Sequence, residues 1–514
     1  MNDQSNSRPN LEGKSKVPLH SKKSYSSSRS YSSSATRIRQ IFIILLSLLT
    51  VAVVAILVLS KDGSAKKPNN HLVVTTSEKV SRSTINTPTT APALLQSPTW
   101  RVAWGSAMAW GDGVATNTTV RELATVGIGG TSVRIRISNL FGNVPLQVSA
   151  ASVAQDLQGA QIVPSSLVQL SFNSSPGIAI PVGQVAYSDP VAMQVTAGET
   201  LAVSIYVSNS DIVTIHPCCA EAKVSFFTPN NGGNQVSQVN SSAFQFSSPW
   251  PRWIDAVDVL QQPGAAPALG SIVVVGDSIT EGFNTSIRWT DVLQQRIDML
   301  PPDEQRAVIN EGITANTLLA LPNNYSKIGG GPAGLDRISQ DAIDQSGVSE
   351  IILFIGTNDL YFGATASQVI AGYQQAIQLV HQSNLKIIGV TLLPRMAGKE
   401  PWTPTQQQYL EQINTWILQP GNFDGTLDFA RIIADDYDGS CIPTSMFAPF
   451  DSGDNLHPSA PGQVAMADSI VGPEIGMPNL PYVPEDIIVT PTKGCMGTTG
   501  IGPPVAMPKG ALPK

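Results

Sequence analysis

Charged residues and cysteines are scarce in this chain of 514 residues. Charged side chains make up 13% of it, against a typical ~25%, and the net charge is −7. No basic patch is visible in the part expected to fold, which argues against a nucleic-acid partner. Four cysteines are too few for a disulfide scaffold, and none has metal-site spacing. They are Cys218, Cys219, Cys441 and Cys495. Of their three pairings we favour Cys441 with Cys495, although connectivity cannot be read from sequence.

Long apolar runs are absent except for one near the N-terminus. Residues 41–59 contain 19 residues without a charge, close to the ~20 that a membrane-spanning helix needs. A cleaved signal peptide fits less well, because its apolar core is roughly 7–15 residues and ends at a small-residue cleavage site. We therefore expect a disordered cytoplasmic tail over 1–39, a transmembrane helix over 40–60 and a stalk over 61–97.

Charge and glycosylation motifs suggest the orientation of this span. Residues 1–39 hold eight Lys or Arg, which favours a cytoplasmic N-terminus. All five Asn-x-Ser/Thr motifs follow the span. They begin at Asn117, Asn173, Asn240, Asn284 and Asn324. The sequence thus predicts a single-pass type II membrane protein whose folded part is lumenal or extracellular.

Two folded domains are expected in a chain of this length. Residues 98–260 contain short apolar or alternating runs separated by turn residues, with no long helical period. The clearest runs are 131–138, 146–154, 192–195 and 200–207. This pattern predicts an all-β domain of the sandwich or jelly-roll type.

Residues 270–472 instead alternate short apolar strands with amphipathic helices. Strands are expected at 271–275, 306–311, 349–355, 386–393 and 426–432. Helices are expected at 287–300, 335–346, 366–382, 404–418 and 461–471. Such alternation predicts a parallel sheet covered by helices on both faces. Residues 473–514 are rich in Pro and Gly, which indicates a partly disordered C-terminal tail.

Ser278 follows the first of these strands, where open α/β sheets place their ligands. A serine hydroxyl is a weak nucleophile until a base takes its proton. His457 is the one plausible base, since the other four histidines lie outside this domain or late in a helix. Asp454, three residues before it, can orient the imidazole. His216, in the sequence IHPCC, is expected to be structural, because adjacent cysteines cannot easily bind one ion with it.

An attacked ester carbonyl also needs donors for the oxyanion that forms. The side-chain amide of Asn358 and the backbone N–H groups of Ser278 and Ala315 can supply them, with no metal or cofactor. Each residue alone has an ordinary explanation, such as a turn or a helix cap. The combination, at successive strand ends, favours a hydrolase.

Four segments together resemble the signature blocks of the SGNH or GDSL hydrolase family: GDSIT, GITAN, GTND and DNLHP. The resemblance implies a flavodoxin-like three-layer α/β/α fold for 270–472. It also implies that Ser278 is the nucleophile, that Asp454 and His457 complete a triad, and that Ser278, Ala315 and Asn358 form the oxyanion hole. Ala315 stands where the family usually has glycine. Alanine keeps the N–H, but a positive φ there would cost energy.

Longer matches, GDSITEG and SGDNLHPSAPGQVAMA, resemble the branch with acetylxylan esterases and arylesterases, in which a β-rich domain precedes the hydrolase. The leading hypothesis is a membrane-anchored serine esterase that removes O-acetyl or other short acyl groups from a carbohydrate or small ester. One alternative is a lipase that acts on long acyl chains with the same residues. Another is a non-catalytic protein that binds glycans through residues 98–260.

Overall fold

The computed structural model describes residues 98–217, 224–261, 269–321, 330–395, 401–437 and 443–481. All of them belong to one compact unit of the chain, residues 91–514. No helix within these described ranges is long and apolar enough to cross a membrane. The predicted span over 40–60 and all four cysteines lie outside the described residues.

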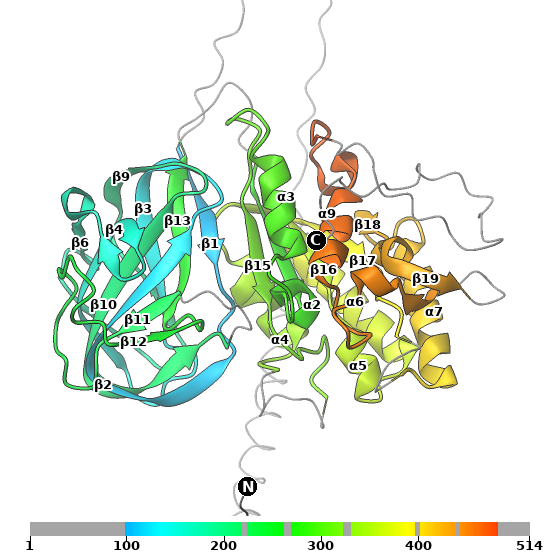
Figure 1. Cartoon of the computed structure of the whole chain (residues 1–514), viewed down its shortest axis with the longest axis horizontal. Coiled ribbons are helices and arrows are strands. Elements are labelled where there is room, and N and C mark those ends of the chain that lie inside the picture. The colour runs from blue at the N-terminus through cyan, green and yellow to red at the C-terminus, as the bar shows by residue number, and fades with distance from the viewer. Residues whose placement is uncertain are drawn as a thin grey trace, which may run out of the picture. The chain divides into compact units, whose positions relative to one another are not determined.

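The first domain is built from two antiparallel sheets (Figure 1). One sheet has the order β1-β13-β3-β8, and β9 also pairs with β3. Its strands are β1 (Thr99–Gly105), β3 (Gly130–Ser138), β8 (Val185–Tyr187), β9 (Val191–Val195) and β13 (Ile254–Gln261). The other has the order β12-β11-β2-β10-β4-β5, with β6 and β7 also on β4. Its strands are β2 (Trp110–Thr125), β4 (Leu146–Gln158), β5 (Gln161–Ile162), β6 (Val168–Leu170), β7 (Ile178–Ile180), β10 (Thr200–Ile215), β11 (Ser225–Phe227) and β12 (Phe246–Ser248).

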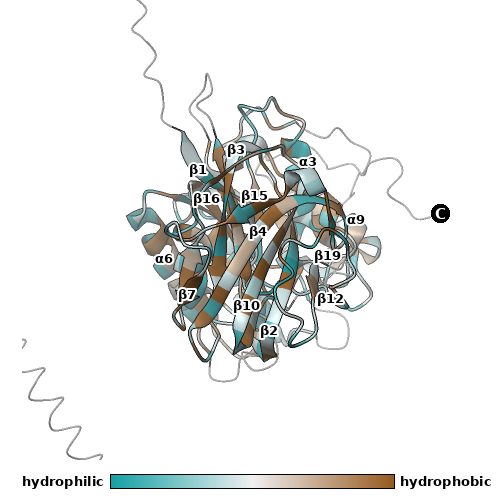
Figure 2. Ribbon diagram, turned by 90° about the vertical axis from the view of Figure 1, so that its left-hand side faces the viewer, coloured by the Kyte–Doolittle hydropathy of each residue, from teal (hydrophilic) through white to brown (hydrophobic). Residues whose placement is uncertain are grey.

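Period-two patterning explains how these sheets pack. Val133, Ile135 and Ile137 of β3 share one apolar core with Val203 and Ile205 of β10. Successive strand residues point to opposite faces, so each strand turns its apolar set to the core. Figure 2 shows the outer face of the larger sheet, where hydrophilic and hydrophobic residues alternate along the strands. The predicted β-sandwich is therefore present.

The second domain contains a five-stranded parallel sheet in the order β15-β14-β16-β17-β18. Numbered along the chain this order is 2-1-3-4-5, which is flavodoxin-like. The strands are β14 (Ser271–Gly276), β15 (Val308–Gly312), β16 (Val348–Phe354), β17 (Lys386–Val390) and β18 (Gly425–Leu427). The helices are α2 (Ser278–Glu281), α3 (Trp289–Ile297), α4 (Gly334–Ile338), α5 (Thr357–Tyr361), α6 (Ala366–Gln382), α7 (Pro404–Leu418), α8 (Phe429–Ile433) and α9 (Ala460–Asp468).

Both faces of the central strand β14 are buried, which explains its continuous apolar run. Ile272 and Val274 pack in one cluster with residues of α3 and α9. Val273 and Val275 pack in the other core, with residues of α6 and α7. Helices α3 and α9 lie side by side (Figure 1). The sheet is thus the middle of three layers.

Some boundaries predicted from the sequence need correction. The strand expected over 426–432 ends at Leu427, because the side chain of Asp428 accepts a hydrogen bond from the N–H of Arg431 and begins helix α8. The residues 473–481, assigned to the C-terminal tail, pack on the α/β domain. Ile475 and Leu480 are buried there.

Hydrogen bonds join the two domains. The N–H of Val102 on β1 donates to the carbonyl of Ser346 at 2.8 Å. The hydroxyl of Ser271, the first residue of β14, donates to the carbonyl of Val102 at 2.7 Å. Gln294 on α3 donates from Nε2 to the carbonyl of Gly127 at 3.0 Å. The β-domain is therefore bonded directly to the sheet and the first long helix of the α/β domain.

Candidate active site

Ser278 sits at a tight junction between strand and helix. Strand β14 ends at Gly276, and the carboxylate of Asp277 accepts a hydrogen bond from the N–H of Ile279 at 3.0 Å. This bond caps the first turn of α2, which begins at Ser278. A side chain at Gly276 would bring Cβ within 2.3 Å of the Thr280 hydroxyl. The turn therefore fixes the serine directly beyond the carboxyl end of the strand.

His457 and Asp454 lie in the loop before α9 and form a hydrogen-bonded chain with the serine. His457 Nε2 lies 2.9 Å from Ser278 Oγ, and His457 Nδ1 lies 2.6 Å from Asp454 Oδ2. The other oxygen of Asp454 accepts the N–H groups of Leu456 and His457. The Phe283 ring packs on the imidazole, with centroids 4.6 Å apart. The three polar side chains expected from the sequence are thus brought together.

The charge of Asp454 is strongly stabilised by this geometry. Burial alone would raise the pKa of this half-buried carboxyl group. Hydrogen bonds from the ring and backbone of His457, together with the charge of that ring, outweigh burial and hold the pKa well below its usual range. A carboxylate that stays ionised can fix the imidazole and stabilise the imidazolium.

Asn284, one of the five potential glycosylation sites, faces the same carboxylate. Its Nδ2, the atom that would carry a glycan, lies 3.5 Å from Oδ2 of Asp454. Its backbone has a φ of 58°, which asparagine tolerates better than most residues. A glycan on this nitrogen would crowd the chain of hydrogen bonds, so we expect the motif to be unmodified.

The remaining predicted residues follow the neighbouring strands β15 and β16. Asn358 donates from Nδ2 to the carbonyl of Asn316 at 2.9 Å, which leaves its second amide hydrogen for another acceptor. Asn316 directly follows Ala315, so this bond ties the two loops together. Ala315 has a φ of 58°. The residue therefore adopts the left-handed conformation that glycine takes without cost, and alanine is strained there.

Arg337 on α4 was not found from the sequence. Its buried guanidinium donates to the carbonyl of Gly276 at 2.9 Å, to the carbonyl of Glu311 at 2.8 Å and to Oδ1 of Asn316 at 3.1 Å. It thereby links the ends of β14 and β15 to the loop that follows β15. With Asp341 four residues later, it has the spacing of an ordinary helix-surface ion pair. No local pattern marks it as part of the site.

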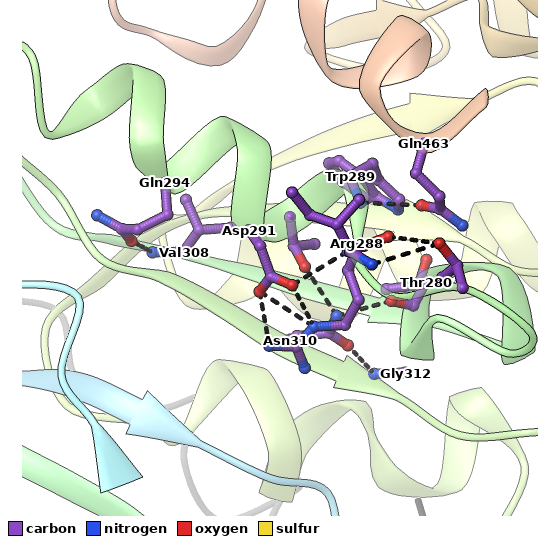
Figure 3. A network of polar contacts seen from close by, with 12 residues as sticks. Thr280, Arg288, Trp289, Asp291, Gln294, Val308, Asn310, Gly312 and Gln463 are labelled. Atoms are coloured by element: carbon purple, nitrogen blue, oxygen red, sulfur yellow. Dashed lines mark hydrogen bonds and ion pairs between the residues drawn. The ribbon is translucent and has the colours of Figure 1, made fainter. Parts of the chain in front are cut away.

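Gln463 is a second residue that the sequence did not mark as part of the site, although it lies in the segment SGDNLHPSAPGQVAMA. This fully buried side chain on α9 accepts from the N–H of Trp289 at 2.8 Å and donates to the carbonyl of Ile279 at 3.1 Å. Asn310 donates to the carbonyl of Thr280 at 2.7 Å from the opposite side (Figure 3). The helix that follows His457 is therefore bonded to the turn that carries Ser278.

A metal centre is not indicated in the part of the chain that the structure describes, where no three His, Cys, Asp or Glu residues group to hold an ion. The arrangement can instead perform acyl transfer through a serine, an imidazole and a carboxylate.

The comparisons with known proteins agree with this chemistry. The chain is a carboxylic ester hydrolase, as the match of residues 274–465 to a family model indicates. That model describes the GDSL-like Lipase/Acylhydrolase family. The α/β domain therefore belongs to the SGNH/GDSL hydrolases, as the sequence motifs predicted. No curated protein matches the chain.

Solved structures of low identity are similar to part of the chain. One is a GDSL-like lipase from Bacteroides thetaiotaomicron, with 16% identity, a TM-score of 0.29, and coverage of 38% of this chain and 83% of that one. Another is an acetylxylan esterase from Geobacillus stearothermophilus, with 18% identity, a TM-score of 0.29, and coverage of 40% and 94%.

Strain at Ala315 leads to a stability prediction. Ala315→Gly should raise the free energy of unfolding by up to about 1 kcal/mol, because glycine adopts a positive φ without cost, and should keep esterase activity because the N–H remains. Ala333→Gly is the matched control: this buried alanine has a φ of −58°, so glycine should lower stability there. Urea unfolding measures both. A loss of stability in Ala315→Gly would contradict the strain.

Asp277 leads to a prediction about pH. Burial, aided by the nearby carboxylates Asp359 and Glu281, raises the pKa of Asp277 to about 7. The folded state therefore binds this proton more tightly than the unfolded state, and the contribution of Asp277 to stability falls as pH rises from about 4 to about 7. Asp277→Asn keeps an acceptor for Ile279 but cannot ionise. Its Tm advantage over the wild type should grow across this range and level off above it, whereas a pH-independent difference would contradict the assignment.

Proposed function

We propose that this protein is a serine esterase that removes O-acetyl or other short acyl groups from a carbohydrate or a small ester. The observation that carries the proposal is the unbroken hydrogen-bond chain from Ser278 Oγ through His457 to Asp454. Each bond has the donor and acceptor that serine-dependent acyl transfer requires.

The reaction follows from this chain. Ser278 Oγ attacks the ester carbonyl while His457 Nε2 takes its proton, and the carbonyl oxygen becomes an oxyanion. Backbone N–H groups of Ser278 and Ala315 and the amide of Asn358 donate to that oxyanion. The intermediate collapses, and the alcohol leaves with the proton from His457. Water then attacks the acyl-serine with His457 as base, which releases the carboxylic acid and restores Ser278.

Two features support a short acyl group on a larger alcohol. The sequence has no amphipathic segment that would form a lid over a long acyl chain. The resemblance of GDSITEG and SGDNLHPSAPGQVAMA to the acetylxylan-esterase branch supports a carbohydrate as the alcohol.

Hydrolysis of p-nitrophenyl esters tests the proposal. The purified full chain should hydrolyse the acetate with a higher kcat/KM than the decanoate, because a site for short acyl groups gains nothing from a long apolar chain. Ser278→Ala should lower kcat on the acetate by about three orders of magnitude or more, since it removes the nucleophile.

His381→Ala is the matched control for this experiment. His381 is an exposed histidine that pairs with Asp424, 2.8 Å away, outside the chain of hydrogen bonds, so its loss should leave kcat unchanged. A decanoate preference would favour the lipase alternative. Unchanged turnover in Ser278→Ala would contradict the serine mechanism, and a wild type without activity would favour the glycan-binding alternative.

A further inference from the structure

A histidine of the β-domain reaches into the α/β domain beside the nucleophile. His216 directly follows β10, and its Nδ1 lies 2.6 Å from the carbonyl oxygen of Ala107. A carbonyl oxygen can only accept, so Nδ1 carries a proton. The other ring nitrogen, Nε2, lies 3.5 Å from Oε1 of Glu281. The His216 and Glu281 side chains are only 7% and 2% exposed. The contact is therefore an interdomain pair of two buried polar groups.

Further titratable groups lie around the ring of His216. Besides Glu281, two buried acidic side chains interact electrostatically with its ring: Glu122 from β2 and Asp341 from the π-helix Ser339–Ile343 that follows α4. Cations also lie there, since Arg252 is close to Glu122 and Arg337 pairs with Asp341. A protonated ring presents a donor to Glu281, whereas a neutral ring would face the carboxylate with a lone pair.

Glu281 contacts both His216 and the loop that carries Ala315. It lies on α2, three residues after Ser278, and its Oε2 accepts a hydrogen bond from the hydroxyl of Thr314. Thr314 directly precedes Ala315. The backbone is also close, because a Cβ on Gly312 would lie 2.5 Å from the nitrogen of Glu281. One carboxylate therefore joins the β-domain, the nucleophile helix and this loop.

Apolar packing from the β-domain supports the same loop. Ala107 and Ala109, between β1 and β2, form a small buried cluster with Ile313. The Ala107 carbonyl in this cluster is the acceptor for His216. A left-handed alanine persists only where its surroundings hold it. Residues of the β-domain thus pack against the loop whose conformation at Ala315 is strained.

We propose that the β-domain completes the active site, with His216 as a positioning residue that acts through Glu281 and Thr314 to keep the N–H of Ala315 in place as an oxyanion donor. This inference rests on the proposed esterase function. It gives the β-domain a part in catalysis that does not require glycan binding.

The experiment compares variants of the full chain by kcat, KM, Tm and affinity for a boronic acid. Boron bonds to Ser278 Oγ, the displaced proton goes to His457, and the tetrahedral boronate resembles the oxyanion intermediate. His216→Ala should lower kcat about tenfold or more and lower the affinity for the boronic acid by a similar factor. KM should change less than about threefold, because only stabilisation of the oxyanion is impaired. His381→Ala should match the wild type.

Thr314→Val provides a second variant that leaves the domain interface intact. It removes the hydroxyl that donates to Glu281, with little change in the shape of the side chain. It should lower kcat and the affinity for the boronic acid as His216→Ala does. The double variant should be no worse than either single variant, because His216 and Thr314 act through the same carboxylate. If His216→Ala folds poorly, Thr314→Val alone still tests the proposal.

Two results would overturn the proposal. One is an active wild type whose folded His216→Ala and Thr314→Val variants keep its kcat and boronic acid affinity. The other is a lowered Tm with additive losses, as expected if His216 only joins the domains. A wild type without esterase activity contradicts the proposed function itself, so the two failures can be told apart.

Discussion

The hydrogen bond between Ser278 and His457 joins residues that lie 179 positions apart in the chain. The rest of the α/β domain serves to bring these two groups together. Strand β14 is buried on both faces, which fixes where the serine emerges from the sheet. Gln463 bonds the helix after His457 to the turn that carries Ser278. The distance between Ser278 and His457 is therefore set by the packing of α9 against α2 and α3, and not by the loop residues alone.

The carboxyl groups near Ser278 differ in the direction of their pKa shifts: the pKa of Asp454 is lowered, and those of Asp277 and Asp359 are raised. Asp454 is held ionised because it accepts from His457, and it can stabilise a developing positive charge. Asp277 and Asp359 accept only backbone N–H groups, and burial raises the pKa of each to about 7. These two groups hold the turns beside Ser278 and Asn358. Environment, and not residue type, thus decides which aspartate assists the histidine.

Local patterns in the sequence were enough to predict the sandwich, the parallel sheet and the residues of the hydrogen-bond chain. Each depends on spacing within a few residues, such as the apolar run before Ser278 or the separation of Asp454 from His457. Local patterns failed where tertiary contacts decide the outcome. Arg337 and Gln463 look like ordinary helix residues until their carbonyl partners from other loops are known. The sequence predicted a structural role for His216 from its neighbouring cysteines, and its contact with Glu281 of the other domain has no local signature.

Covalent labelling tests most directly whether the hydroxyl of Ser278 is an activated nucleophile. A fluorophosphonate reacts with a serine only where a base activates the hydroxyl, and it leaves a stable adduct that peptide mass spectrometry locates. We expect a single adduct on Ser278 in the full chain, with labelling greatly slowed in His457→Ala. An active wild type that carries the adduct on another serine, or carries none, would contradict it.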